Sequence, residues 1–139
     1  MKDLFRKGRA AQERNQVSKQ PAVVLRKQAR ERIELHIAEV GKRLKRAPNR
    51  IYVMGQRTKW GNCSARCNLS FNWRLVMAPD FVLRYIVTHE MVSNMKERSL
   101  IMDALIKQYD IKISNEELSN EVSSVLNDLI ADGEIADPR

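Results

Sequence analysis

The sequence predicts an α+β fold: a long helix, a small antiparallel β-hairpin or sheet, a second helix, and then an α-helical hairpin. Three observations support this prediction. Apolar residues recur every three or four positions from Leu25 to Leu44, which is typical of one buried helix face. Residues 50–55 and 68–73 have strand propensity and are separated by a turn-rich segment. Helical spacing of apolar residues returns between residues 100 and 130.

Length and composition are typical of one folded domain with an appendage. The chain has 139 residues, of which 43% are hydrophobic and 30% charged, a soluble globular composition rather than a disordered one. No apolar run approaches the roughly 18 residues of a membrane span, and the charged N-terminus lacks the apolar segment of a secretory signal. With two cysteines, we expect a cytoplasmic protein without a structural disulfide.

Charge divides the chain into three predicted segments. Residues 1–50 contain 15 Lys and Arg against 5 Asp and Glu, whereas residues 93–139 contain 5 against 10. The net charge therefore changes sign near residue 93, which suggests a boundary between two units. We expect a basic tail over residues 1–21, a partial core domain over residues 22–92 and an acidic helical hairpin over residues 93–139.

The first predicted helix follows Pro21 and is stopped by Ala47-Pro48-Asn49, with Gly41 weakening its last turn. The residues before it are polar and basic, and we expect a frayed helix or a tail there. His36 lies beside the apolar stripe, so we expect it at the edge of the core rather than in a metal site.

The predicted hairpin pairs residues 50–55 with residues 68–73 and places Trp60, Gly61 and Cys63 in its loop. Taken alone, Trp60 is typical of an aromatic residue that packs on a hairpin.

Three more helices are predicted after the hairpin. Asp80, which follows a proline, is the expected N-cap of the first of them. Ser114 and Glu117 have the spacing of a capping box for the last helix, and Gly133 is its expected stop.

The helix after Asp80 carries the sharpest chemical feature of the sequence, the pair His89-Glu90. In a zinc peptidase helix, two histidines four residues apart bind Zn²⁺, and the glutamate after the first takes a proton from the metal-bound water. A His-Glu pair without the second histidine has little specificity, because most such pairs are structural or lie on the surface.

Four motifs occur in order along the chain: Arg57-Thr-Lys-Trp-Gly-Asn-Cys63, Asn68-Leu-Ser-Phe-Asn-Trp-Arg-Leu75, Ala78-Pro79 and Tyr85-Ile-Val-Thr-His-Glu90. In this order and spacing they resemble the YgjP-like zinc metallopeptidase domain, a family related to the SprT and WLM peptidases. The resemblance covers about residues 22–92.

The resemblance implies a helix packed on a small antiparallel sheet, with the helix of His89 laid across it. It also implies a zinc cofactor and a peptide or protein substrate. His89 would be the first zinc ligand and Glu90 the general base. Trp60, Gly61 and Cys63 would lie beside the active-site cleft.

The sequence departs from the family pattern at two positions. The second zinc ligand should follow His89 by one helical turn, where the chain has Ser93, and the third should lie near Ser99. Since a catalytic zinc takes three protein ligands, we expect an incomplete or degenerate peptidase with weak or absent zinc binding. The thiolates of Cys63 and Cys67 together with His89 are an alternative ligand set.

Two other function classes stay open. Residues 1–92 contain 20 Lys and Arg against 7 Asp and Glu, which favours nucleic-acid binding with Trp60 stacked on a base, or else a solvated basic helix face. Residues 98–118 are faintly similar to the C-terminal helical arms of trigger factor, which suggests an interaction or chaperone-like role. The simpler role of this segment is to cover the apolar face of the helix of His89.

Overall fold

The structure, a computed structural model, describes residues 21–55 and 59–131. The segment before Pro21 and the stop expected at Gly133 lie outside these ranges. Within them, helices and a small mixed sheet follow one another along the chain, which confirms the α+β class. No helix in the described ranges is both long enough and apolar enough to cross a membrane.

Helix α2 (Ala22–Leu44) is the predicted first helix, and its buried side chains recur at helical spacing: Leu25, Ala29, Ile33, His36, Ile37 and Val40. The helix ends where Lys45 adopts a left-handed conformation (φ 54°) and donates its backbone N–H to the carbonyl oxygen of Gly41. A Cβ atom at Gly41 would lie 2.6 Å from the carbonyl oxygen of Arg46. Glycine therefore permits the chain to turn back tightly after the helix.

The sheet contains β1 (Arg50–Met54), β2 (Gly61–Cys63) and β3 (Asn68–Asn72) in the order β1-β3-β2. The expected antiparallel pairing of residues 50–55 with residues 68–73 is wrong. β1 pairs with β3 in parallel, with Arg50 opposite Asn68, and β2 pairs with β3 in the antiparallel direction.

The hydrogen bonds of the turn give the physical reason for this difference. The tight turn lies between β2 and β3, where the N–H of Cys67 donates to the carbonyl oxygen of Ser64 over 2.9 Å and the N–H of Ser64 donates to that of Asn68 over 3.0 Å. The segment after β1 thus crosses to the far edge of the sheet and supplies β2 there. Gly61 and Cys63 consequently belong to a strand rather than to a hairpin loop.

A short 3-10 helix, η1 (Trp73–Met77), follows β3 and leads to α3 (Asp80–Val92). Asp80 is the first residue of α3 rather than its N-cap, which is Pro79. Its carboxylate instead faces α2, where it lies 2.9 Å from Nε2 of His36 and 3.4 Å from a guanidinium nitrogen of Arg32. His36 is buried with 8% of its surface exposed, as expected for a residue at the edge of the core.

The chain ends in α4 (Arg98–Gln108) and α5 (Asn115–Ala131), which confirms the predicted helical hairpin. The Ser114 hydroxyl accepts a hydrogen bond from the backbone N–H of Glu117 over 3.1 Å, so the predicted cap is present. Helix α5 buries the stripe that the sequence indicated: Leu118, Val122, Val125, Leu126 and Leu129.

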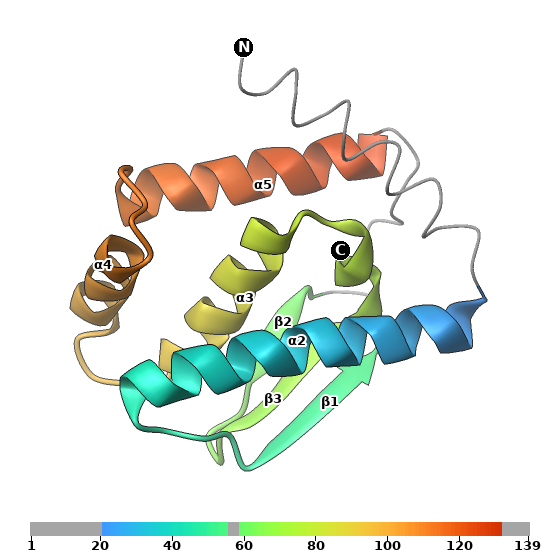
Figure 1. Cartoon of the computed structure of the whole chain (residues 1–139), viewed down its shortest axis with the longest axis horizontal. Helices are drawn as coiled ribbons and strands as arrows, with labels where there is room; N and C mark the ends of the chain where they lie inside the picture. The colour runs from blue at the N-terminus through green and yellow to red at the C-terminus, as the bar shows by residue number, and fades with distance from the viewer. Residues whose placement is uncertain (1–20, 56–58, 132–139) are drawn as a thin grey trace.

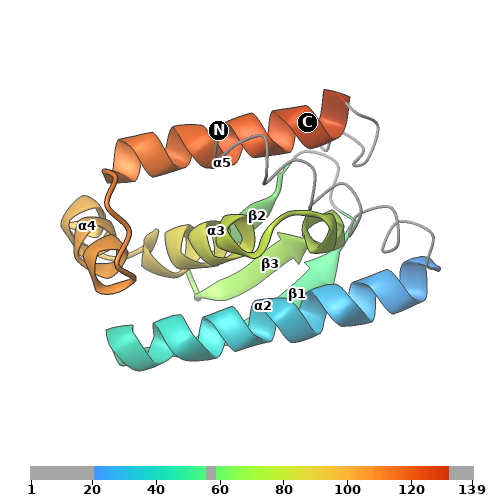
Figure 2. The ribbon, with the colours of Figure 1, turned by 45° about the horizontal axis from the view of Figure 1, so that its top comes forward.

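Helix α3 is the centre of the arrangement. In Figures 1 and 2 it lies between α2 and α5, and it contacts both helices as well as β2 and α4. Side chains of α2, β3, η1, α3 and α5 share one core, and α4 packs on the end of α3 in a smaller cluster around Val92, Met102 and Leu105. The helical hairpin therefore covers α3, as the simpler of the two interpretations predicted.

Candidate functional site

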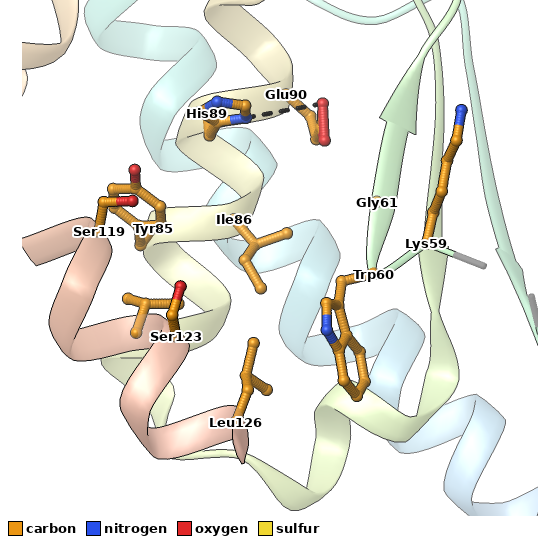
Figure 3. A pocket seen from close by; sticks show the side chains of 11 residues that line it. Lys59, Trp60, Gly61, Tyr85, Ile86, His89, Glu90, Ser119, Ser123 and Leu126 are labelled. Atoms are coloured by element: carbon orange, nitrogen blue, oxygen red, sulfur yellow. Dashed lines mark ion pairs between the residues drawn. The ribbon is translucent and has the colours of Figure 1, made fainter. Parts of the chain in front are cut away.

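A groove of about 340 Å³ lies between α3, the start of β2 and α5 (Figure 3). Its lining residues come from all three elements: Lys59, Trp60, Gly61, Tyr85, Ile86, His89, Glu90, Ser119, Val122, Ser123 and Leu126. Four of the five residues that the sequence analysis singled out thus share one cleft. The fifth, Cys63, is absent from the lining.

Glu90 is held against the sheet at the position of Gly61. A Cβ atom at Gly61 would lie 3.1 Å from Cγ and 3.2 Å from Oε2 of Glu90, and 3.2 Å from Cδ1 of Phe71. The Glu90 side chain is 13% exposed. The missing side chain at Gly61 therefore makes the room in which the carboxylate lies beside the strand.

His89 is in a different environment from that of its neighbour. Its side chain is 56% exposed, its Nδ1 atom lies 3.8 Å from Oε1 of Glu90, and its ring stacks on Tyr85 with 6.1 Å between the ring centroids. Figure 3 shows the imidazole on the groove side of α3, with a nitrogen turned toward the carboxylate. The imidazole is thus free to take a ligand from the cleft.

Cys63 points from β2 toward the end of α3 and the residues just after it. Asn94 Nδ2 donates to the Cys63 sulfur over 3.4 Å and to the carbonyl oxygen of Ser64 over 2.6 Å. Burial raises the pKa of the Cys63 thiol; a hydrogen bond with Ser93 opposes this, while the nearby Cys67 and Glu90 add to it. Cys63 is therefore a protonated thiol at neutral pH, and it lies outside the groove lining.

The donor set of this site does not fit a catalytic zinc. Ser93, where the family resemblance predicts the second ligand, ends α3 and donates its hydroxyl to the backbone carbonyl oxygen of Glu90 over 2.8 Å. Ser99, near the place predicted for the third ligand, is an exposed residue of α4. Within residues 21–55 and 59–131, no three His, Cys, Asp or Glu side chains are grouped so that they could hold a metal ion. The alternative set of Cys63, Cys67 and His89 is thus not assembled either.

Sequence reasoning missed the far wall of the groove. Ser119, Ser123 and Leu126 of α5 face α3 across the cleft (Figure 3). Lys59 precedes Trp60 at the edge of the groove, and its side chain extends along β2 toward Asn62. The apolar stripe of α5 was visible in the sequence, and the hairpin was expected to cover the helix of His89, but no local signal tells which α5 residues line a groove beside that helix. Nothing in the sequence indicated that Lys59 lines the groove, except its position next to Trp60.

Comparison with known protein families gives a match that covers most of the chain. The model of the family described as YgjP-like, metallopeptidase domain, matches residues 3–93. This match ends where the net charge changes sign, and it begins earlier than the resemblance noted from residue 22. No curated protein and no solved structure matches the chain, so the similarity to trigger factor stays a prediction. The chain belongs to the YgjP-like metallopeptidase domain family.

Proposed function

We propose that this chain is a degenerate metallopeptidase: it keeps the peptide cleft and the general base of the family but lacks two zinc ligands. Ser93 is the observation that carries the proposal. A serine hydroxyl at this position donates to the backbone carbonyl oxygen of Glu90 and is a poor substitute for an imidazole as a zinc ligand. We therefore expect weak or absent zinc binding and little hydrolysis of peptide bonds.

The roles of the remaining residues follow from their positions in the cleft. Glu90 is the one carboxylate of the described lining, and with His89 3.8 Å away it forms the polar part of the groove. In a complete site, Glu90 would accept a proton from water and His89 would hold the metal. In this chain His89 and Glu90 can instead hydrogen-bond the backbone of a bound peptide.

The rest of the groove supports a peptide or protein segment as its occupant. Trp60, Ile86 and Leu126 supply apolar surface, while Glu90 supplies a negative charge and Ser119 and Ser123 supply hydroxyl groups. Mostly apolar walls with a few polar groups are typical of sites that bind organic ligands.

Metal content tests the degenerate site. The purified full chain is mixed with zinc and the excess metal is removed. Native mass spectrometry then measures the mass of the protein with any zinc that it retains. We expect no retained zinc in the wild type and one retained zinc in the Ser93→His variant. The introduced imidazole would stand one helical turn from His89 and beside the Cys63 thiol, which together make three ligands.

Two matched variants separate a zinc site from nonspecific binding. Ser93→Ala removes the hydroxyl without adding a ligand and should stay without zinc, and His89→Ala in the Ser93→His background should lose the zinc. One tightly bound zinc in the wild type that His89→Ala removes would overturn the proposal. So would cleavage of unfolded casein by the wild type that His89→Ala abolishes.

A further inference from the structure

The central part of the chain is basic without any acidic residue. Residues 40–79 contain nine Lys and Arg and no Asp or Glu. This segment supplies the end of α2, all three strands and η1. Arg50 lies within a strand, and the other eight cations lie in α2, in η1 and in the segments that flank and connect the strands. The positive charge of this segment is therefore placed next to the strands in the sequence, with no carboxylate of the same segment to neutralise it.

Among the helices of residues 21–55 and 59–131, none covers one face of the sheet. Along β1 the exposure alternates: Arg50, Tyr52 and Met54 are exposed, whereas Ile51 and Val53 pack against the core. Helices α2 and α3 contact the sheet on the core side, in front of the strands in Figure 1. The opposite face is solvent-accessible at β1.

The strand register defines the residues of this face. Ser70 lies opposite Tyr52, Asn62 lies opposite Ser70, and Asn68 lies opposite Arg50. We name this surface the open sheet face, and its residues are Arg50, Tyr52, Met54, Asn62, Asn68 and Ser70. The groove of His89 and Glu90 lies on the other side of the sheet, since Gly61 and Glu90 meet on the core side.

The open sheet face combines an aromatic ring, amides and cations. Tyr52 is 40% exposed and Met54 is 42% exposed. Around them, Asn49 donates its amide to Oδ1 of Asn68 over 3.0 Å, and Lys59 Nζ lies 3.5 Å from Oδ1 of Asn62. An exposed aromatic ring on a sheet, with cations at its sides, is the arrangement on which unstacked bases bind.

We propose that the open sheet face binds single-stranded RNA. Tyr52 stacks on one base, Arg50 and Lys59 contact phosphates, and the polar side chains of Ser70 and Asn68 reach a ribose 2′-hydroxyl. A duplex does not fit this chemistry because its bases are already stacked on one another. An acidic peptide would match the charge of the face but would leave the Tyr52 ring without a stacking partner.

Fluorescence anisotropy with a labelled oligouridine of about 12 nucleotides tests the proposal on the full chain. Stacking of one base on an aromatic ring typically accounts for about a 5- to 100-fold difference in affinity, so Tyr52→Ala should weaken binding at least 5-fold. Tyr52→Phe keeps the ring and should bind within about 2-fold of the wild type.

A salt series tests the phosphate contacts. Loss of one phosphate contact should lower the slope of log K against log salt by about 0.7 for a single strand. Arg50→Ala should show this change. Lys107→Ala is the matched control, because Lys107 is exposed on α4, away from the sheet, and its slope should equal that of the wild type.

Three results would overturn the proposal. The first is equal affinity of the wild type and Tyr52→Ala, which would assign RNA binding to other basic residues of the chain. The second is equal or tighter binding of oligodeoxyuridine or of an RNA duplex. The third is binding of poly-glutamate that competes fully with RNA. The zinc measurements on Ser93→His are independent of all three, since they concern the opposite side of the sheet.

Discussion

Replacement of Gly61 by alanine tests how the cleft holds Glu90. Gly61 has an ordinary backbone conformation, so alanine is allowed there, but its Cβ atom would meet two neighbours at 3.1–3.2 Å. One of them is Phe71, which is fully buried and has no room to move. The other is the Glu90 side chain, which is 13% exposed and can rotate toward solvent.

The size of the effect follows from two opposing contributions. Alanine in a strand is more favourable than glycine by about 0.5–1 kcal/mol because it restricts the unfolded chain. Overpacking a buried contact typically costs about 1–3 kcal/mol. We therefore expect Gly61→Ala to lower the free energy of unfolding by about 1 kcal/mol, which corresponds to a fall of about 4 °C in Tm.

Urea denaturation followed by tryptophan fluorescence measures this change, and a double-mutant cycle identifies its cause. Glu90→Ala removes both Glu90 atoms that the new Cβ would meet, so Gly61→Ala in that background should cost less by about 0.5–1 kcal/mol. An equal cost in both backgrounds would refute the contact between Gly61 and Glu90. A Gly61→Ala variant more stable than the wild type would refute the tight packing itself.

Three further variants test the fold. Ser114→Ala removes the cap of α5 and should lower the free energy of unfolding by about 1 kcal/mol in urea denaturation; an unchanged value would contradict the cap. Leu129→Ala truncates a side chain that is 1% exposed, so a loss of about 2–5 kcal/mol is expected, and a loss below about 1 kcal/mol would show that α5 does not pack on the core. Burial alone would raise the pKa of Asp80, but the hydrogen bond from His36 and the charge of Arg32 outweigh it and lower this pKa. The carboxylate therefore stabilises the fold fully above its unfolded pKa of about 3.9 and loses this effect as pH falls through the lower folded value. Asp80→Asn should be less stable than the wild type by about 0.5–1 kcal/mol at pH 7 and by less at about pH 2.5; a difference that grows in acid would contradict the pairing.

Parts of the fold that depend on local periodicity could be predicted from the sequence. The stripes of α2 and α5 and the cap at Ser114 are local patterns, and each is present in the structure. Strand pairing is not local. Residues 50–55 and 68–73 were predicted as strands, but their parallel direction depends on where the tight turn forms, and the turn at Ser64–Cys67 was not distinguished from a loop.

The candidate site, like the fold, could be predicted from the sequence only in part. The resemblance to the family implied that Trp60, Gly61, His89 and Glu90 share one cleft, and the structure brings them together. Cys63 lies on the same face of β2 as Gly61 but two residues further along the strand, so it contacts Ser93 and Asn94 at the end of α3 instead of the groove. This position depends on how β2 packs against α3, which a prediction that placed Cys63 in a hairpin loop did not include.

By itself, the sequence determined the family of this chain and its helices, and it has serine at the two places where zinc ligands were expected, because these depend on residue types and their spacing along the chain. Only the tertiary structure decided the mixed sheet, the α5 wall of the cleft and the uncovered face around Tyr52. These features arise from contacts between segments far apart in the chain, and such contacts depend on how whole faces pack rather than on any local pattern.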